Sequence, residues 1–258
     1  MKRPSLFWIT LVFIAVLYLG FIVAMLAATA AYTSLGEMWQ ALQSREIRYA
    51  TGLSLLTCTV TALLSLILAV PIGYLLARSK FRGKALVEAA LDIPIVLPPL
   101  VVGLCLLILF QTSFGRMVEE HVAFTYTIAG VILAQLVIGA AFAIRTMRGT
   151  FDHLSSRPEE VAMTLGCSRF QAVRFVTLPA ARRGMFAAAS VAWARSLGEF
   201  GPILVFAGAT RMKTEVLPTT VWLELSVGNL EAAVAVGLLM VGMAMIVLVA
   251  VRLTGESL

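Results

Sequence analysis

Charged residues are scarce in this chain. Asp, Glu, Lys and Arg make up 13% of the 258 residues, hydrophobic residues make up 60%, and the mean hydropathy is +0.95. A soluble domain carries about a quarter charged residues, because its surface must be solvated by water. The composition therefore excludes a soluble domain, a disordered chain and a collagen-like fibre, and it indicates a polytopic membrane protein.

Residues that hold metals or form disulfides are also few. Cys58, Cys105 and Cys167 lie far apart with no CxxC spacing, and His121 and His153 form no HExxH pattern. A disulfide framework, a zinc site and an intramembrane metalloprotease are therefore excluded. Neither histidine is expected at membrane depth, where a serine nucleophile would need a base. We predict no metal, no cofactor and no catalytic residue.

A nucleotide-binding loop is missing as well. The chain has no GxxxxGK[ST] sequence, since the only glycine-lysine pair, Gly83-Lys84, lacks the first glycine at the required distance. The chain cannot hydrolyse ATP by that chemistry. Any ATP-driven activity must therefore obtain its energy from another subunit.

Long apolar runs are abundant, and a membrane-spanning helix needs about 20 such residues. Six runs predict an all-α, six-span membrane domain that occupies residues 1–258 as one unit: 7–31, 53–77, 93–111, 127–144, 185–207 and 232–251. Pro94, Pro98 and Pro99 are expected to bend the third run. The small-residue sequence Ala28-Thr29-Ala30 leaves a cleaved signal peptide as the alternative for the first run, although that run exceeds the 7–15 residues of a signal core.

The distribution of basic residues predicts the orientation. Of the 20 Lys and Arg residues, most lie at the N-terminus (Lys2 and Arg3), in the loop 78–84 and in the loop 145–183. Because basic loops stay in the cytoplasm, both termini and both of these loops are predicted to be cytoplasmic.

The loop 145–183 is predicted to form two helices of about nine residues joined by a glycine turn. The signals are two capping boxes, a glycine stop and a proline stop, namely Ser156 with Glu159, Ser168 with Gln171, Gly166 and Pro179. Such short helices are not stable alone. They could pack under the bundle, insert into a groove of a cytoplasmic partner, or read DNA, which is disfavoured because both ends are tethered to the membrane.

The same loop resembles the EAA loop of ABC importer permeases, whose pattern is EAA, x3, G, x9, IxLP. Here the pattern is carried by Glu160, Val161, Ala162, Gly166, Val176, Leu178 and Pro179, with Val161 in place of Ala and Val176 in place of Ile. The resemblance implies a coupling helix that docks on a separate ATPase subunit, and it assigns that role to Glu160, Ala162, Gly166, Val176, Leu178 and Pro179.

Two more segments narrow the resemblance to molybdate/tungstate-type permeases. The segment 94–103 reads PIVLPPLVVG and resembles their PPxVxG sequence, and the segment 194–201 reads ARSLGEFG and resembles their RSLGEFG sequence, which sulfate-type permeases share loosely. Pro202 stands where Ala is expected, which weakens the assignment of a particular oxyanion.

Charges inside the fifth apolar run are the last signal. Arg195 and Glu199 are spaced i, i+4, so they project from one helix face and can pair. Such charges face a bundle interior or a wet cavity. One hypothesis is a translocation pathway or gate formed by Arg195, Ser196, Gly198, Glu199 and Gly201, where the glycines permit close helix approach; the other is a purely structural ion pair.

The resemblance implies a homodimeric importer of the inner membrane for a tetrahedral oxyanion, with molybdate or tungstate ahead of sulfate or thiosulfate. It implies two ATPase subunits and a periplasmic or lipid-anchored substrate-binding protein as partners, and no nucleic acid. A secondary transporter or channel is the alternative class. That class would explain the spans and the intramembrane charges, but not the helix-pair loop.

Overall fold

Fourteen α-helices and one π-helical segment make up the described chain. The computed structural model describes the backbone of residues 6–257, and the side chains within it except those of residue 35 and residues 250–257. The predicted basic pair Lys2 and Arg3 lies outside the described residues. The elements are α1 (Leu6–Ala31), α2 (Leu35–Gln43), α3 (Arg45–Arg78), α4 (Lys84–Val96), α5 (Pro99–Gln111), α6 (Ser113–His121), α7 (Ile128–His153), α8 (Arg157–Thr164), α9 (Arg169–Ala172), η1 (Val173–Thr177), α10 (Leu178–Ala180), α11 (Arg182–Leu197), α12 (Gly201–Phe206), α13 (Leu217–Ser226) and α14 (Leu230–Ser257).

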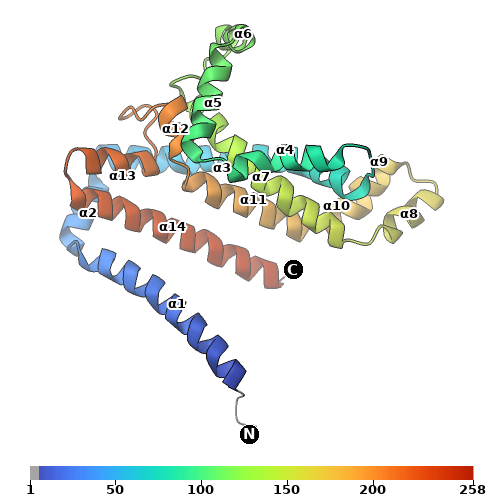
Figure 1. Ribbon diagram of the computed structural model, residues 1–258, viewed down its shortest axis with the longest axis horizontal. Coiled ribbons are helices and arrows are strands. Elements are labelled where there is room, and N and C mark those ends of the chain that lie inside the picture. The colour runs from blue at the N-terminus through green and yellow to red at the C-terminus, as the bar shows by residue number, and fades with distance from the viewer. Residues whose placement is uncertain (1–5, 258) are drawn as a thin grey trace.

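The helices α3, α7 and α11 form the centre of the bundle and run side by side along its long axis (Figure 1). Their shared core is rich in small side chains, including Ala69 of α3, Ala143 of α7 and Ala188 of α11. A methyl group on Gly73 would lie 2.9 Å from the Met147 Cβ atom, so α3 and α7 touch almost backbone to backbone. Small residues allow this approach, as is typical of helices packed within a membrane.

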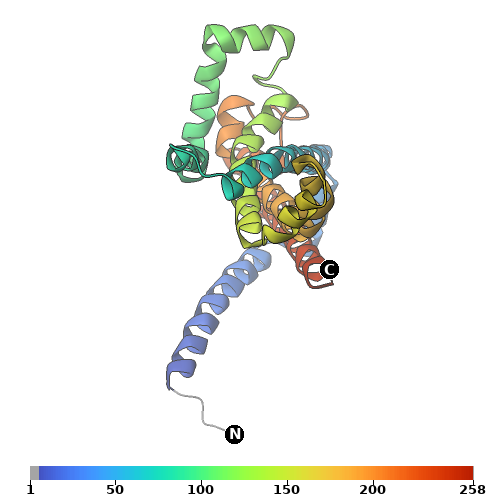
Figure 2. The same cartoon turned by 90° about the vertical axis from the view of Figure 1, so that its right-hand side faces the viewer.

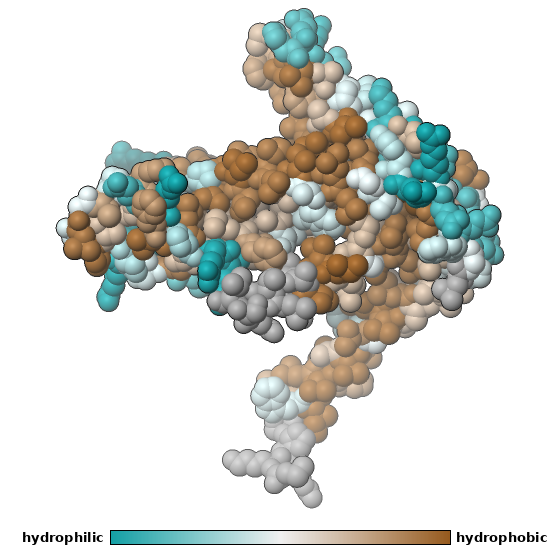
Figure 3. All heavy atoms as spheres, turned by 180° about the vertical axis from the view of Figure 1, so that it is seen from behind, coloured by the Kyte–Doolittle hydropathy of each residue, from teal (hydrophilic) through white to brown (hydrophobic). Residues whose placement is uncertain are grey.

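The helices α1, α5 and α6 stand away from that centre. Figures 1 and 2 show α1 splayed from the bundle, and α5 rising beside α12 with α6 at its tip. The described part of α1 buries no side chain and is apolar on all faces, which is typical of a helix surrounded by lipid. In the face shown in Figure 3, an apolar middle lies between more polar ends.

The structure supports the predicted membrane protein but not the full number of predicted spans. Within the described residues, four helices are long and apolar enough to cross a membrane, namely α1, α3, α7 and the part of α14 from Leu230 to Val249. The pair α4 and α5 makes a fifth if it counts as one bent span.

Two of the predicted runs are broken. The run 93–111 is divided between α4 and α5, which meet at an angle of 111°, because Pro98 and Pro99 cannot donate the backbone hydrogen bonds that a continuous helix needs there. The run 185–207 ends as a regular helix at Leu197 and resumes at Gly201. Pro71, by contrast, lies within the uninterrupted α3 and is exposed.

Candidate functional site

The two breaks are packed against each other, although they lie about a hundred residues apart in sequence. A methyl group on Gly201, the first residue of α12, would lie 2.8 Å from the Leu100 nitrogen of α5. A methyl group on Gly103 would likewise lie 2.8 Å from the Pro202 Cα atom. The segments 94–103 and 194–201, which carry the sequence resemblance, therefore form one interlocked site.

The break after α11 is held by a buried glutamine. Gln135 of α7 donates from Nε2 to the Ser196 carbonyl at 3.2 Å, and its Oε1 atom accepts from the Thr61 hydroxyl of α3 at 3.1 Å. The Ser196 carbonyl lies at the end of α11, where regular helical partners run out. Gln135 thus ties the broken end to both central helices. Its position as the one polar side chain in the apolar stretch 128–144 was the only sequence signal for this role.

The predicted intramembrane ion pair is present. The Arg195 Nη2 atom lies 3.2 Å from the Glu199 Oε2 atom, and the guanidinium stacks 5.5 Å from the centre of the Phe142 ring. The Glu199 side chain is buried, whereas 39% of the Arg195 side chain is exposed. Arg195 therefore neutralises Glu199 from the outer surface of the chain, where a groove of about 300 Å³ is lined with apolar side chains, including Val191 and Leu248.

The other predicted gate residues have different surroundings. Ser196 is buried and its hydroxyl donates to the Ala192 carbonyl at 2.8 Å. Within the described chain no other helix lies close to Gly198, because a methyl group there would meet nothing closer than 3.9 Å. Gly201 alone of this glycine pair packs closely against another helix of the described chain.

The predicted helix pair of the loop 145–183 exists with altered ends. The second capping box is confirmed, since Ser168 accepts from the Gln171 nitrogen and Gln171 accepts from the Ser168 nitrogen. Gly166 adopts a φ of +93°, a conformation that glycine reaches without steric cost. Pro179 does not end the second helix, because the chain remains helical from Arg169 through α9, η1 and α10 to Ala180.

The first capping box is not formed. Ser156 makes no capping hydrogen bond, and Glu159 does not reach back to it. Instead, the Glu159 carboxylate accepts hydrogen bonds from the Tyr74 hydroxyl of α3 and from the Thr177 hydroxyl of η1, the latter at 2.9 Å. The hydroxyl groups of half-buried Tyr74 and buried Thr177 take the carboxylate from its local partner. The sequence resemblance singled out Glu160, which is exposed, and missed Glu159, Tyr74 and Thr177.

Three large apolar side chains of the helix pair in this loop do not pack under the bundle. Ala162 and Ala172 are buried, but Leu165, Phe170 and Phe175 are 81%, 72% and 66% exposed. The same loop leads directly into α11, which begins at Arg182 and ends at the break beside Glu199. The exposed apolar face therefore lies next to the start of α11, and the interlocked site lies at its end.

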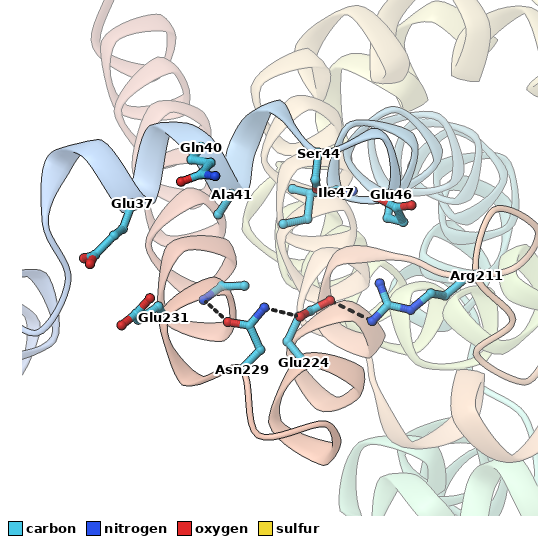
Figure 4. Close-up of a pocket in the computed structure, with 11 residues that line it drawn as sticks. Glu37, Gln40, Ala41, Ser44, Glu46, Ile47, Arg211, Glu224, Asn229 and Glu231 are labelled. Atoms are coloured by element: carbon cyan, nitrogen blue, oxygen red, sulfur yellow. Dashed lines mark hydrogen bonds and ion pairs between the residues drawn. The ribbon is translucent and has the colours of Figure 1, made fainter.

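A polar cavity of about 420 Å³ lies at the opposite end of the bundle, between α2, α13 and the start of α14. Figure 4 shows Arg211 reaching to the Glu224 carboxylate, at 2.7 Å, and Asn229 bound to its other oxygen. The remaining charged residues of the lining are Glu37, Glu46 and Glu231. Because Arg211 is neutralised by Glu224, this cavity is negatively charged and does not suit an anion.

Hydrogen bonding and burial perturb the acids near this end. A hydrogen bond from the Ser34 backbone nitrogen lowers the pKa of Glu37. Burial raises the pKa of Glu215, whose partner Arg211 lies 4.0 Å away and only partly offsets that effect. The hydrogen bond to Glu224 raises the pKa of Arg211.

Comparisons with known proteins agree with the permease resemblance of the segments that form this site. The family model described as binding-protein-dependent transport system inner membrane component matches residues 69–255. The molybdenum transport system permease protein ModB of Mycobacterium tuberculosis is 32% identical over 234 residues, which cover 90% of this chain and 88% of that protein.

A second relative is more similar over a shorter stretch. The molybdate/tungstate transport system permease protein WtpB of Pyrococcus abyssi is 42% identical over 154 residues, which cover 60% of this chain and 58% of WtpB. Among solved structures, a bacterial alginate ABC transporter in complex with a periplasmic protein contains a chain with a TM-score of 0.76, at 17% identity, covering 97% of this chain and 93% of that one. At that identity the likeness establishes the fold alone.

Proposed function

The chain belongs to the binding-protein-dependent transport system inner membrane components, and on that premise we propose that it imports a tetrahedral oxyanion, molybdate or tungstate. As a member of that family it is a non-catalytic, multi-pass permease of the inner membrane. The observation that carries the substrate class is the interlocking of segments 94–103 and 194–201, the two segments that resemble molybdate-type permeases, together with the names of the relatives ModB and WtpB.

The proposed topology has six crossings, with α4–α5 as a bent third crossing and α11–α12 as a broken fifth. In lipid, backbone groups freed at a break must be covered by protein or water. Gln135 and the packing of Gly201 on α5 supply such cover. Both termini and the loop 145–183 are placed in the cytoplasm by the excess of basic residues.

The exposed face of α8–α10 is the proposed contact with an ATP-binding subunit. Leu165, Phe170 and Phe175 form an apolar surface at the cytoplasmic end of the bundle, which suits insertion into a groove of a partner. The coupling residues taken from the resemblance shape this surface: Glu160, Ala162, Gly166, Val176, Leu178 and Pro179. ATP binding in the partner draws two such loops together and opens the pathway outward, and hydrolysis resets it.

The proposed assembly contains two copies of the permease. Arg195 is partly exposed at predicted membrane depth, in a groove otherwise apolar. A cation is costly against lipid, whereas a second copy or a wet pathway between two copies removes that cost. Arg195, Ser196, Gly198, Glu199 and Gly201 then lie at the pathway, where neutralised Glu199 does not repel a passing anion. A substrate-binding protein delivers the anion to the outer face.

Reconstitution tests this proposal. The permease, its ATP-binding subunit and an oxyanion-binding protein in liposomes are expected to take up molybdate or tungstate with ATP, and sulfate less well. The permease without the ATP-binding subunit is the control, because a channel or secondary transporter would still move the anion. Uptake of only a sugar or an amino acid by the complete complex contradicts the proposal.

A further inference from the structure

Glu159 is a buried carboxylate in a helix pair that turns Leu165, Phe170 and Phe175 outward. Only 6% of the residue is exposed, and it lies in the first turn of α8. One of its oxygens accepts from the Tyr74 hydroxyl and the other accepts from the Thr177 hydroxyl. These three residues belong to α8, α3 and η1, so one side chain joins three elements.

The α3 side of this junction is firmly anchored. The Tyr74 ring packs edge-on against Phe151 of α7 at 5.6 Å between ring centres, and Arg78 donates to the Leu154 carbonyl at 2.8 Å. Gly73 is pressed against the α7 backbone one residue before Tyr74. The ends of α3 and α7 therefore move as one body.

The α8 side of this junction is connected to its neighbours by a short segment and a glycine turn. The helix α8 is joined to α7 by the short segment 154–156 and to α9 through Gly166, whose φ is +93°. Thr177 is the last residue of a π-helical segment, a rare form that is frequent at functional sites. Without the bridge through Glu159, a force on the exposed apolar face could turn α8 while α3 stayed in place.

We propose that Glu159 is a positioning residue that transmits movement of α8 to the central helix α3. The inference rests on the proposed function, because it takes the exposed face of α8–α10 to be where the ATP-binding subunit pulls. A carboxylate suits this role, since its two oxygens hold two donors on different elements at once, and charge-assisted hydrogen bonds are stronger than neutral ones.

Removal of single hydroxyl groups is the sharpest test. Tyr74→Phe and Thr177→Val each delete one donor and keep the shape of the side chain. In the reconstituted complex, each is expected to lower the anions transported per ATP hydrolysed about fivefold or more, while ATP hydrolysis continues. In a Glu159→Ala background, Tyr74→Phe should not lower this ratio further, because the carboxylate that accepts from the Tyr74 hydroxyl is already absent.

The controls are matched hydroxyl deletions elsewhere. Tyr49→Phe removes a hydrogen bond to the Lys213 carbonyl at the other end of α3, and Thr146→Val removes one within α7. Both should leave the ratio of transport to hydrolysis unchanged. If the bridge only stabilises the fold, transport and hydrolysis will fall together in the Tyr74 and Thr177 variants at a constant ratio, and the proposal is then wrong.

Amide hydrogen exchange separates this inference from the proposed function. In the permease itself, Tyr74→Phe is expected to speed exchange across residues 157–164 about tenfold, relative to Tyr49→Phe. Faster exchange with no oxyanion transport by any variant would reject the substrate class and leave the mechanical link standing. Unchanged exchange would overturn the link, whatever the complex transports.

Discussion

Single residues in this permease act mainly by neutralising or filling what a broken helix leaves open. Gln135 covers the carbonyl at the end of α11, Arg195 neutralises Glu199, and Gly201 makes room for α5. Each effect is local, so each can be tested by one substitution, with a substitution at a nearby residue for comparison.

The pair Arg195 and Glu199 should be energetically coupled. Arg195→Ala and Glu199→Ala are expected to be less than additive by about 1 kcal/mol in unfolding from detergent micelles, because Glu199 is buried and loses its neutralising partner. The figure is modest since 39% of the Arg195 side chain is exposed, which weakens an ion pair. Strict additivity in the double-mutant cycle would mean that the two charges do not interact.

The glycines of the same segment should behave differently. Gly201→Ala is expected to destabilise the permease by about 1–3 kcal/mol, because the new methyl group meets the α5 backbone at 2.8 Å. Gly198→Ala, with open space around it, is the matched control and should cost under about 0.5 kcal/mol. Thermal unfolding of both variants in the same detergent measures these costs. Equal losses of stability in the two variants would contradict the interlocked arrangement.

At the scale of elements, the two ends of the bundle differ in chemistry. One end presents the exposed apolar face of α8–α10, and the other carries the acidic cavity beside α2 and α13. Glu215, in the segment between α12 and α13, is buried close to that cavity's Arg211, so the packing of this end should respond to pH.

Burial raises the pKa of Glu215 above its ordinary value of 4.5. A raised pKa in the folded state means that the folded protein binds the proton more tightly than the unfolded chain. The stabilisation is therefore fully present below about pH 4.5 and is lost as the pH rises through the raised pKa. Glu215→Gln should remove that loss. Between pH 4 and pH 8, the unfolding temperature of the variant is expected to exceed that of the wild type by a margin that grows as the pH rises. Parallel profiles would contradict the assignment.

At the scale of the whole molecule, the orientation in the membrane decides which end meets which partner. Cys167 is exposed beside Gly166, Cys105 is exposed on α5, and Cys58 is buried. The native cysteine at position 167 therefore reports the side on which the helix pair lies.

In a Cys105→Ser background, a membrane-impermeant maleimide should label Cys167 only after the cells are permeabilised. Glu231→Cys, at the rim of the cavity on the opposite end, should be labelled in intact cells when Cys167 is also replaced by Ser. Labelling of Cys167 from outside intact cells would reverse the proposed topology and with it the contact with an ATP-binding subunit.

The sequence by itself determined the class of protein, the helix pair with its glycine joint, and the pairing of Arg195 with Glu199. These follow from local rules, since hydropathy, capping and i, i+4 spacing act within a few residues. The tertiary structure alone decided that the fifth apolar run is broken, that this break and the bend of the third run interlock through Gly103 and Gly201, and that Glu159 serves α3 and not its own helix cap. A glycine shows its role only when its neighbour is known, and a carboxylate takes the strongest donors within reach, which here come from residues far away in the chain.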